Sequence, residues 1–141
     1  MLLWLPEHGA DGEMQGAARQ VTRYFGTAAP HHHADEEEDL FPLLAADAGL
    51  ADLIAHLGRE HTRLDALWAD LAPRLECLAR GEVPEGLAAA VEAFTTAYGA
   101  HIDCEDAQIL PAARRRLDQA QLGALGRAMA RRRGVTSTAG D

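Results

Sequence analysis

Histidine and acidic residues occur twice in the chain at spacings suited to metal binding. The first copy, residues 32–42, reads His-x-x-x-Glu-Glu-x-x-Leu-Phe-Pro, and the second, residues 101–111, reads His-x-x-x-Glu-Asp-x-x-Ile-Leu-Pro. Residues four apart lie on one face of a helix, so the histidine and the first glutamate of each copy direct an imidazole and a carboxylate at one point. Both groups are good ligands for iron and similar first-row metals. The candidate ligands from the two copies are His32, Glu36, His101 and Glu105.

Both pairs fall along apolar stripes that helical periodicity predicts to face a core. One stripe consists of Val21, Phe25, Ala28 and Leu43, and the other of Leu87, Val91, Phe94, Tyr98 and Ile109. A buried carboxylate costs several kcal/mol or takes up a proton, so two of them beside two histidines need a compensating cation. In the competing interpretation, the histidines are ordinary core residues and the glutamates turn to solvent.

A further cluster, His56-Leu-Gly-Arg-Glu60-His61, lies between the two copies. His61 lies between Leu57 and Leu64 in the apolar stripe of its helix and is the fifth predicted ligand. His56 lies at the edge of that stripe, which favours a place on the surface or behind a ligand. Glu60 is intermediate, because it can bridge metals, orient a ligand or face solvent.

Three more residues lie close enough to the predicted ligands to be additional ligands or to contact the ligands. His33 and Glu37 are about 100° around the helix from His32 and Glu36, which makes them flanking residues. Tyr98 lies three residues before His101 on the same face, where it either lines a metal pocket or packs in the core. The residues predicted as additional ligands or as partners of ligands are therefore His33, Glu37, His56, Glu60 and Tyr98.

Four helical segments must position these side chains. We expect helices over residues 11–46, 50–79, 84–117 and 119–132, with Gly49 and Gly81 in the turns. The 141 residues suit one domain, 1–141, whose last residues, 134–141, form a frayed tail. Hydrophobic residues make up 48% of the chain but aromatic residues only 5%, a composition that favours helix over strand.

The charge balance narrows the range of partners. The formal net charge is −9, from 22 acidic and 13 basic residues, and such a surface repels nucleic-acid phosphates. We interpret the arginine runs 114–116 and 131–133 as solvated helix faces. Two cysteines are too few for a disulfide framework, and no apolar run reaches the length of a membrane span. The chain is therefore expected in the cytoplasm, without a membrane or nucleic-acid partner.

These residues resemble the hemerythrin-like (HHE cation-binding) family. The resemblance covers about residues 10–117 and rests on both motif copies together with Glu60-His61. It implies an all-α, up-down helical bundle of the hemerythrin type. It also implies two iron ions with oxo or carboxylate bridges, or another divalent metal, on the five ligands His32, Glu36, His61, His101 and Glu105. Relatives bind dioxygen, sense oxygen or iron, or handle peroxide and nitric oxide.

The chain departs from the family pattern at its start. Relatives carry another histidine in a full first helix, whereas residues 1–10 read as a remnant of that helix in which only His8 is available. A bundle without that helix exposes an apolar groove, which favours a homodimer. The short helix at 119–132 is an additional element that partly fills the gap.

Three functions remain open at this stage. The favoured one is a metal-binding protein that binds or senses dioxygen or iron without efficient turnover. The second is a di-iron enzyme that reduces peroxide, dioxygen or nitric oxide. The third is a helical interaction protein with a degraded metal site. No catalytic nucleophile or cofactor-binding loop stands out, so no catalytic residue is predicted.

Overall fold

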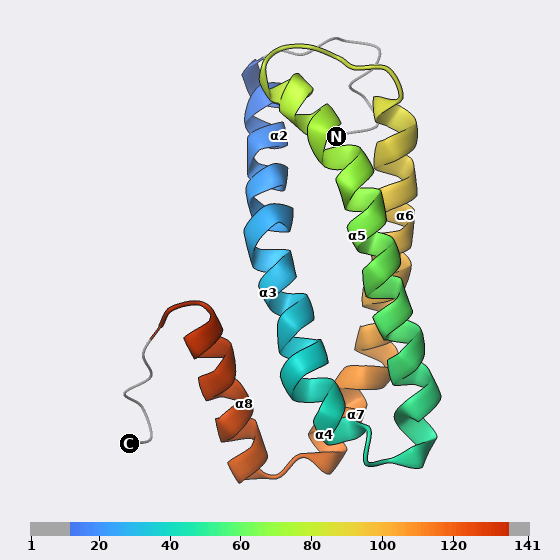
Figure 1. The fold of residues 1–141 in the computed structure, drawn as a ribbon, viewed down its shortest axis with the longest axis vertical. Helices are drawn as coiled ribbons and strands as arrows, with labels where there is room; N and C mark the ends of the chain where they lie inside the picture. The colour runs from blue at the N-terminus through green and yellow to red at the C-terminus, as the bar shows by residue number, and fades with distance from the viewer. Residues whose placement is uncertain (1–11, 136–141) are drawn as a thin grey trace.

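The computed structural model describes residues 12–135, which form three long antiparallel helical rods and one shorter helix (Figure 1). The first rod contains α2 (Gly12–Arg23), η2 (Tyr24–Ala28), α3 (Ala29–Ala34), η3 (Asp35–Leu40) and α4 (Phe41–Leu44). A short turn, η4 (Ala48–Leu50), leads to the second rod, α5 (Ala51–Ala79). The third rod contains α6 (Leu87–Cys104), η5 (Glu105–Ile109) and α7 (Leu110–Arg116), and α8 (Gln119–Arg132) follows it. The described residues contain no strand, so the predicted all-α, up-down bundle is confirmed.

The ends of the helices largely follow the predicted turn residues. Gly81 and Gly86 have φ angles of +91° and +79°, which glycine adopts more easily than other residues. The third rod therefore begins at Leu87, after Gly86, and not at Pro84 as the sequence indicated. Asp118 caps α8 by accepting a hydrogen bond from the Gln121 N–H, while the Gln121 side chain accepts one from the Asp118 N–H. The predicted remnant helix over residues 1–10 lies outside the described residues.

Wide, π-type turns interrupt the rods at η2, η3 and η5. Each of these turns ends two residues before a proline, at Pro30, Pro42 and Pro111. A proline inside an α-helix lacks the N–H and clashes with the carbonyl four residues earlier. In each wide turn the N–H just before the proline instead bonds to a carbonyl five residues earlier. The extra residue relieves the clash and shifts the helical register beyond it.

This register shift changes which residues of the first rod face the core. Ala28, inside η2, and Leu43, after η3, are exposed. The prediction that they belong to the apolar stripe is therefore wrong. Unbroken helical periodicity does not hold across a wide turn, because each one adds a residue that the 3.6-residue repeat does not count.

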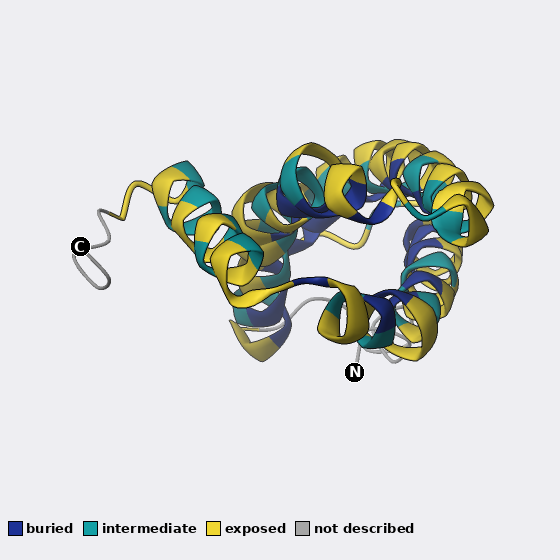
Figure 2. Cartoon of the chain, turned by 90° about the horizontal axis from the view of Figure 1, so that it is seen from below, coloured by how far each residue is buried: buried dark blue, intermediate teal, exposed yellow. Residues whose placement is uncertain are grey.

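Two apolar clusters hold the three rods together, and buried residues line the inner faces of the rods (Figure 2). One cluster, near the start of α2 and the end of α5, contains Met14, Ala18, Leu64, Leu71, Leu75, Leu78, Leu87, Ala90, Val91 and Phe94. The other, near the opposite end, contains Leu40, Phe41, Leu44, Leu57, Ile109 and Leu117. A smaller group of buried polar residues lies in the same interior: Glu36, His61, His101 and Glu105; a fifth buried polar residue, Asp35, faces α8.

Helix α8 lies outside the three rods, beside η3 (Figures 1 and 2). None of its residues is fully buried, although the partly buried Leu125 packs against the apolar cluster that contains Leu117. Arg132 and Arg133 also form ion pairs with acidic residues of η3. The prediction of a solvated arginine face is therefore wrong for Arg132, which is partly buried, whereas Arg131 and Arg133 are exposed.

Within the described residues, we find no helix with the length and apolar character needed to cross a membrane.

Candidate metal centre

Four buried side chains from four different elements converge in the interior. Glu36 comes from η3, His61 from α5, His101 from α6 and Glu105 from η5. Each offers one ligand atom, and these four atoms all lie within 4.8 Å of one another. This is the grouping that the two motif copies and the intervening Glu-His pair predicted. The fifth predicted ligand, His32, lies beside this group.

The two glutamates occupy equivalent places in the backbone. The Phe41 N–H bonds to the Glu36 carbonyl, and the Leu110 N–H bonds to the Glu105 carbonyl. Each glutamate therefore supplies the carbonyl that closes a wide turn, in both copies of the motif. The sequence repeat is a structural repeat, and the proline at its end is the reason for the wide turn.

His32 approaches both carboxylates from the solvent side. Its Nε2 lies 2.6 Å from Glu36 Oε1 and 3.5 Å from Glu105 Oε2. The other oxygen of each glutamate faces the buried histidines. Glu36 Oε2 lies 3.5 Å from His61 Nε2, and Glu105 Oε1 lies 2.5 Å from His101 Nε2. Each carboxylate thus spans two positions, one beside His32 and one beside the two buried imidazoles.

Two further glutamates fix the buried imidazoles from behind. Glu37 Oε1 lies 2.8 Å from His61 Nδ1, and Glu60 Oε1 lies 3.0 Å from His101 Nδ1. An ionised carboxylate only accepts hydrogen bonds, so each Nδ1 carries the proton and donates it. In a neutral imidazole the Nε2 is then a lone-pair acceptor, which is the form that binds metals. Glu37 and Glu60 were predicted as ligands or partners of ligands, and here they contact the predicted ligands.

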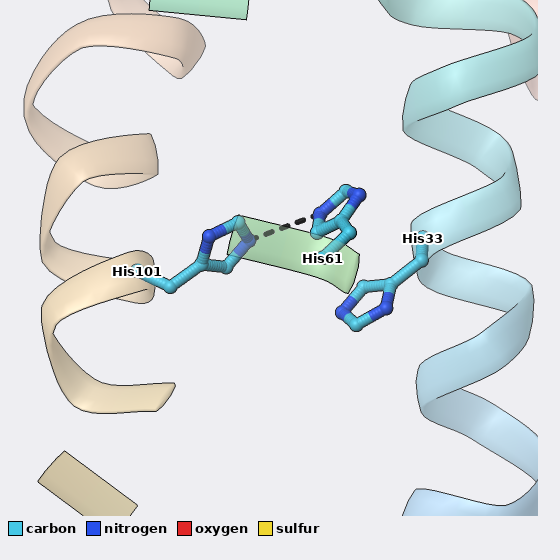
Figure 3. A group of neighbouring side chains, drawn as sticks. All are labelled: His33, His61 and His101. Carbon is cyan, nitrogen blue, oxygen red and sulfur yellow. Dashed lines mark hydrogen bonds between the residues drawn. The ribbon is translucent and has the colours of Figure 1, made fainter. Parts of the chain in front are cut away.

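Three inward-facing carboxylate oxygens lack hydrogen-bond donors, and two imidazole nitrogens face each other at hydrogen-bond distance. The Nε2 atoms of His61 and His101 lie 3.1 Å apart, facing each other (Figure 3). Both carboxylate oxygens of Glu36 and Oε1 of Glu105 are buried and receive no hydrogen bond in favourable geometry. Lone pairs and negative charges that converge in a dry interior repel one another unless positive charge lies between them. The donor set therefore fits a first-row metal cation.

The pKa values of the site also indicate that positive charge is stabilised beside the two carboxylates. Close contacts of its ring with the Glu105 and Glu36 carboxylates raise the pKa of His32 to about 10. Burial lowers the pKa of His61, but hydrogen bonds to Glu105, Glu36 and Glu37 outweigh it and raise the value to about 10. Burial also raises the pKa of Glu105, yet contacts with His101, His32 and His61 bring it below its usual range. Without a metal, protons on the histidines compensate the carboxylates.

His33 lies against the site but differs from the other histidines. Its ring stacks on that of His61, with centroids 4.0 Å apart and planes 14° from parallel (Figure 3). A ligand atom of His33 lies within 4.8 Å of ligand atoms of His61 and His101. Because stacked rings direct their lone pairs along parallel planes, His33 and His61 do not point at one metal position in this arrangement. Burial lowers the pKa of His33, which keeps its ring neutral beside a cation.

A small apolar cavity adjoins His33. It has a volume of about 50 Å³, enough for a very small molecule. Its walls are formed by Phe25, Ala29, Pro30, His33, Leu64, Asp65, Trp68, Phe94 and Tyr98. Tyr98 stacks on Phe94 and meets Phe25 edge to face, so it is mainly part of this aromatic wall.

The remaining predicted residue, His56, lies at the surface. Its side chain is exposed, and its Nε2 lies 3.4 Å from Glu60 Oε2. Since Glu60 also contacts His101, His56 reaches the buried group only through that carboxylate. Cys104, which directly precedes Glu105 in the chain, carries a free thiol. Burial and the charges of Glu60 and Glu105 raise the pKa of this thiol.

Sequence reasoning missed the acidic residues on the outer face of η3. Asp35, Glu38 and Asp39 point away from the metal-binding face and pair with Arg132, the last residue of α8. The signal for them lies in the repeat itself. The positions that correspond to these three acids in the second copy are Cys104, Ala107 and Gln108, all uncharged.

Comparison with known proteins gives two matches. The family model of the hemerythrin HHE cation binding domain matches residues 2–113. An uncharacterized protein of Haemophilus influenzae is 34% identical over 107 residues, which cover 73% of this chain and 60% of the relative. The chain therefore spans less than two thirds of that relative's length. Helix α8 begins after the segment that the family model matches.

Proposed function

Since the chain belongs to the hemerythrin HHE cation-binding domain family, we propose that it is a non-haem di-iron protein that binds or senses dioxygen or iron. The family and the His/Glu cluster support metal binding. Iron, the number of ions and the small-molecule ligand are our proposal. The observation that carries it is the orientation of Glu36 and Glu105, each with one oxygen beside His32 and the other beside the buried histidines.

We assign two ion positions on this basis. His61 and His101 would hold an ion at the inner position and His32 one at the outer position, and Glu36 and Glu105 would contribute an oxygen to each. Iron suits mixed imidazole and carboxylate donors of this kind, although another divalent metal is compatible with the same set. Glu37 and Glu60 hold the imidazoles in the tautomer that binds a metal, as outer carboxylates do in other metal sites.

The outer position has fewer protein donors than the inner one and faces solvent. The His32 side chain is 46% exposed, whereas that of His101 is 1% exposed. An ion with unfilled coordination positions supplies a place where a small diatomic molecule or peroxide binds. His32 would hold that ion at the open side, and the bridging glutamates would orient it.

One observation favours a reductase as the second candidate. The cavity beside His33 is largely apolar, and His33 stacks on the buried His61, so the cavity offers room for a small substrate near the candidate ligands. A di-iron enzyme that reduces peroxide, dioxygen or nitric oxide would use the same ligands. Turnover with an electron donor distinguishes the enzyme from a binding protein, since the latter shows reversible spectral changes without consumption of the small molecule.

The direct test is iron content, with a near-UV and visible spectrum, on protein purified with and without air. We expect about two irons per chain in the wild type, about one in His32→Ala and none in the double variant Glu36→Ala/Glu105→Ala. His31→Ala is the matched control, because His31 adjoins His32 but contacts none of the candidate ligands. Iron that is absent from the wild type, or retained by the double variant, would overturn the proposal.

We also propose that the protein is a cytoplasmic homodimer. Large apolar side chains are exposed on several elements, among them Leu43 on α4, Leu110 on α7 and Leu122 on α8. Exposed apolar surface of this kind favours association of two copies. Light scattering during gel filtration gives the mass, and a monomer at micromolar concentration would contradict this part of the proposal.

A further inference from the structure

Helix α8 is held against the first rod by a network of ion pairs. Arg132 Nη1 lies 2.6 Å from Asp35 Oδ1 and 2.8 Å from Asp39 Oδ2, and Arg132 Nη2 lies 2.6 Å from Glu38 Oε2. Arg133 Nη2 lies 2.7 Å from Asp35 Oδ2. We call these five residues the clasp. The clasp joins α8 to η3, and the partly buried Leu125 adds an apolar contact with the cluster that contains Leu117.

The clasp and the candidate metal centre share a single turn of backbone. Residues 35–39 of η3 are all acidic. Asp35, Glu38 and Asp39 face α8, whereas Glu36 faces the buried histidines and Glu37 accepts the hydrogen bond from His61. A turn this short moves as one unit, so the position of its outer face determines that of its inner face.

Asp35 makes this linkage strong. Its side chain is 5% exposed, and both arginines compensate its charge. A buried carboxylate that loses its partners is strongly unfavourable and turns toward water. The backbone that must then rearrange carries Glu36, the next residue in the chain.

We propose that Arg132 and Arg133 are positioning residues for the metal centre, and that metal binding and the docking of α8 strengthen each other. The inference rests on the proposed metal site. Thermodynamic linkage requires the effect to be reciprocal: if α8 docking raises metal affinity, a bound metal must tighten α8. The segment matched by the family model ends before α8, so the family match does not include the arginines of the clasp.

A simple charge effect predicts the opposite sign, which makes the proposal testable. Two arginines near a cation repel it, so their removal would raise metal affinity if charge alone mattered. If the arginines act by positioning η3, their removal lowers metal affinity. Arg131 offers a matched control, because it lies in the same turn of α8, is exposed and makes no ion pair with η3.

The experiment is a titration with Co²⁺, followed by its visible absorption, on the full chain and its variants. Hydrogen exchange of residues 119–132 is measured with and without Co²⁺. We expect Arg132→Gln/Arg133→Gln to bind Co²⁺ about fivefold or more weakly, a typical size for coupling between two sites. In this variant α8 should exchange fast with or without metal, whereas in the wild type Co²⁺ slows its exchange. Arg131→Gln should behave as wild type, and Arg132→Lys should recover part of the affinity.

Each result has a defined meaning. Equal or higher Co²⁺ affinity in the double variant, with α8 released, would show that the clasp only tethers the helix and would overturn the proposal. Exchange in wild-type α8 that does not respond to Co²⁺ would also overturn it. If the wild type binds no Co²⁺ and no iron, the proposed metal site fails and the coupling fails with it. That outcome is recognisable, because the double variant would still release α8 in metal-free protein.

Discussion

The two copies of the motif, residues 32–42 and 101–111, share a backbone but not their surroundings. Both place a glutamate near the start of a wide turn, and in both a proline lies two residues after the last residue of that turn. Yet the first histidine, His32, is exposed, whereas the second, His101, is buried and held from behind by Glu60. The repeated residues therefore determine the geometry of the ligands, and the neighbouring elements determine which side of the centre is open.

The copies also differ on their outer faces. Three acids of the first copy bind α8, while the corresponding residues of the second copy are uncharged. Only the first copy therefore has a ligand glutamate whose turn is held by another helix. The following predictions test how far this asymmetry extends.

The largest expected effect is at the two bridging glutamates. Glu105 contacts His101, His61 and His32, whereas Glu36 contacts only His61 and His32. We expect Glu105→Gln to weaken metal binding by more than about 100-fold, beyond the range typical of outer residues, and Glu36→Gln to weaken it less. Competition with a chelator measures both affinities. A larger loss of metal affinity in Glu36→Gln than in Glu105→Gln would contradict the expectation that the glutamate of the second copy contributes more to metal binding.

The next effect is at the carboxylates behind the buried imidazoles. Glu60 is 24% exposed and Glu37 is 48% exposed, so Glu60 is less well screened by water. Removing such a partner typically costs about 10- to 100-fold in metal affinity. We expect Glu60→Gln near the upper end of that range and Glu37→Gln near the lower end, measured in the same chelator competition. Unchanged affinity in both variants would mean that these carboxylates do not orient the ligands.

The metal-free protein should lose stability as the pH rises. The pKa values of His32 and His61 are raised from 6.5 to about 10 in the folded chain. The stability that their protons contribute is complete below pH 6.5 and is lost as the pH rises toward about 10. Metal binding should strengthen over the same range, because the metal displaces those protons. Urea unfolding of chelated protein between these pH values gives the slope, and a stability that rises with pH would contradict the prediction.

The smallest effect is expected from making the outer faces alike. In Glu38→Ala/Asp39→Gln the first copy takes the residues of the second, and Arg132 keeps only Asp35. We expect amide exchange in α8 to become a few times faster, with the fold retained, because exposed ion pairs contribute little individually. The reciprocal variant, Ala107→Glu/Gln108→Asp, is the control and should leave α8 unchanged.

Periodicity and residue type predicted the helices, because helical patterns depend on neighbours within one or two turns. The motif repeat and the intervening Glu-His pair also indicated the four residues that converge, Glu36, His61, His101 and Glu105. Stripe positions after a wide turn, such as Leu43, were not predictable from a regular repeat, since a proline changes the register. The clasp was also missed. Arg132 and Asp35 are 97 residues apart, and a helix with no buried residue gives no sequence signal for where it docks.

Cys104 places a thiol next to a centre for which we propose dioxygen chemistry. Sulfur oxidation begins from the thiolate, and the thiol form is far less reactive. Burial and the negative charges of Glu60 and Glu105 disfavour that thiolate. The carboxylates proposed to bind the cation would therefore also keep Cys104 in its less reactive thiol form. This would protect Cys104 from oxidation while dioxygen binds repeatedly at the neighbouring centre.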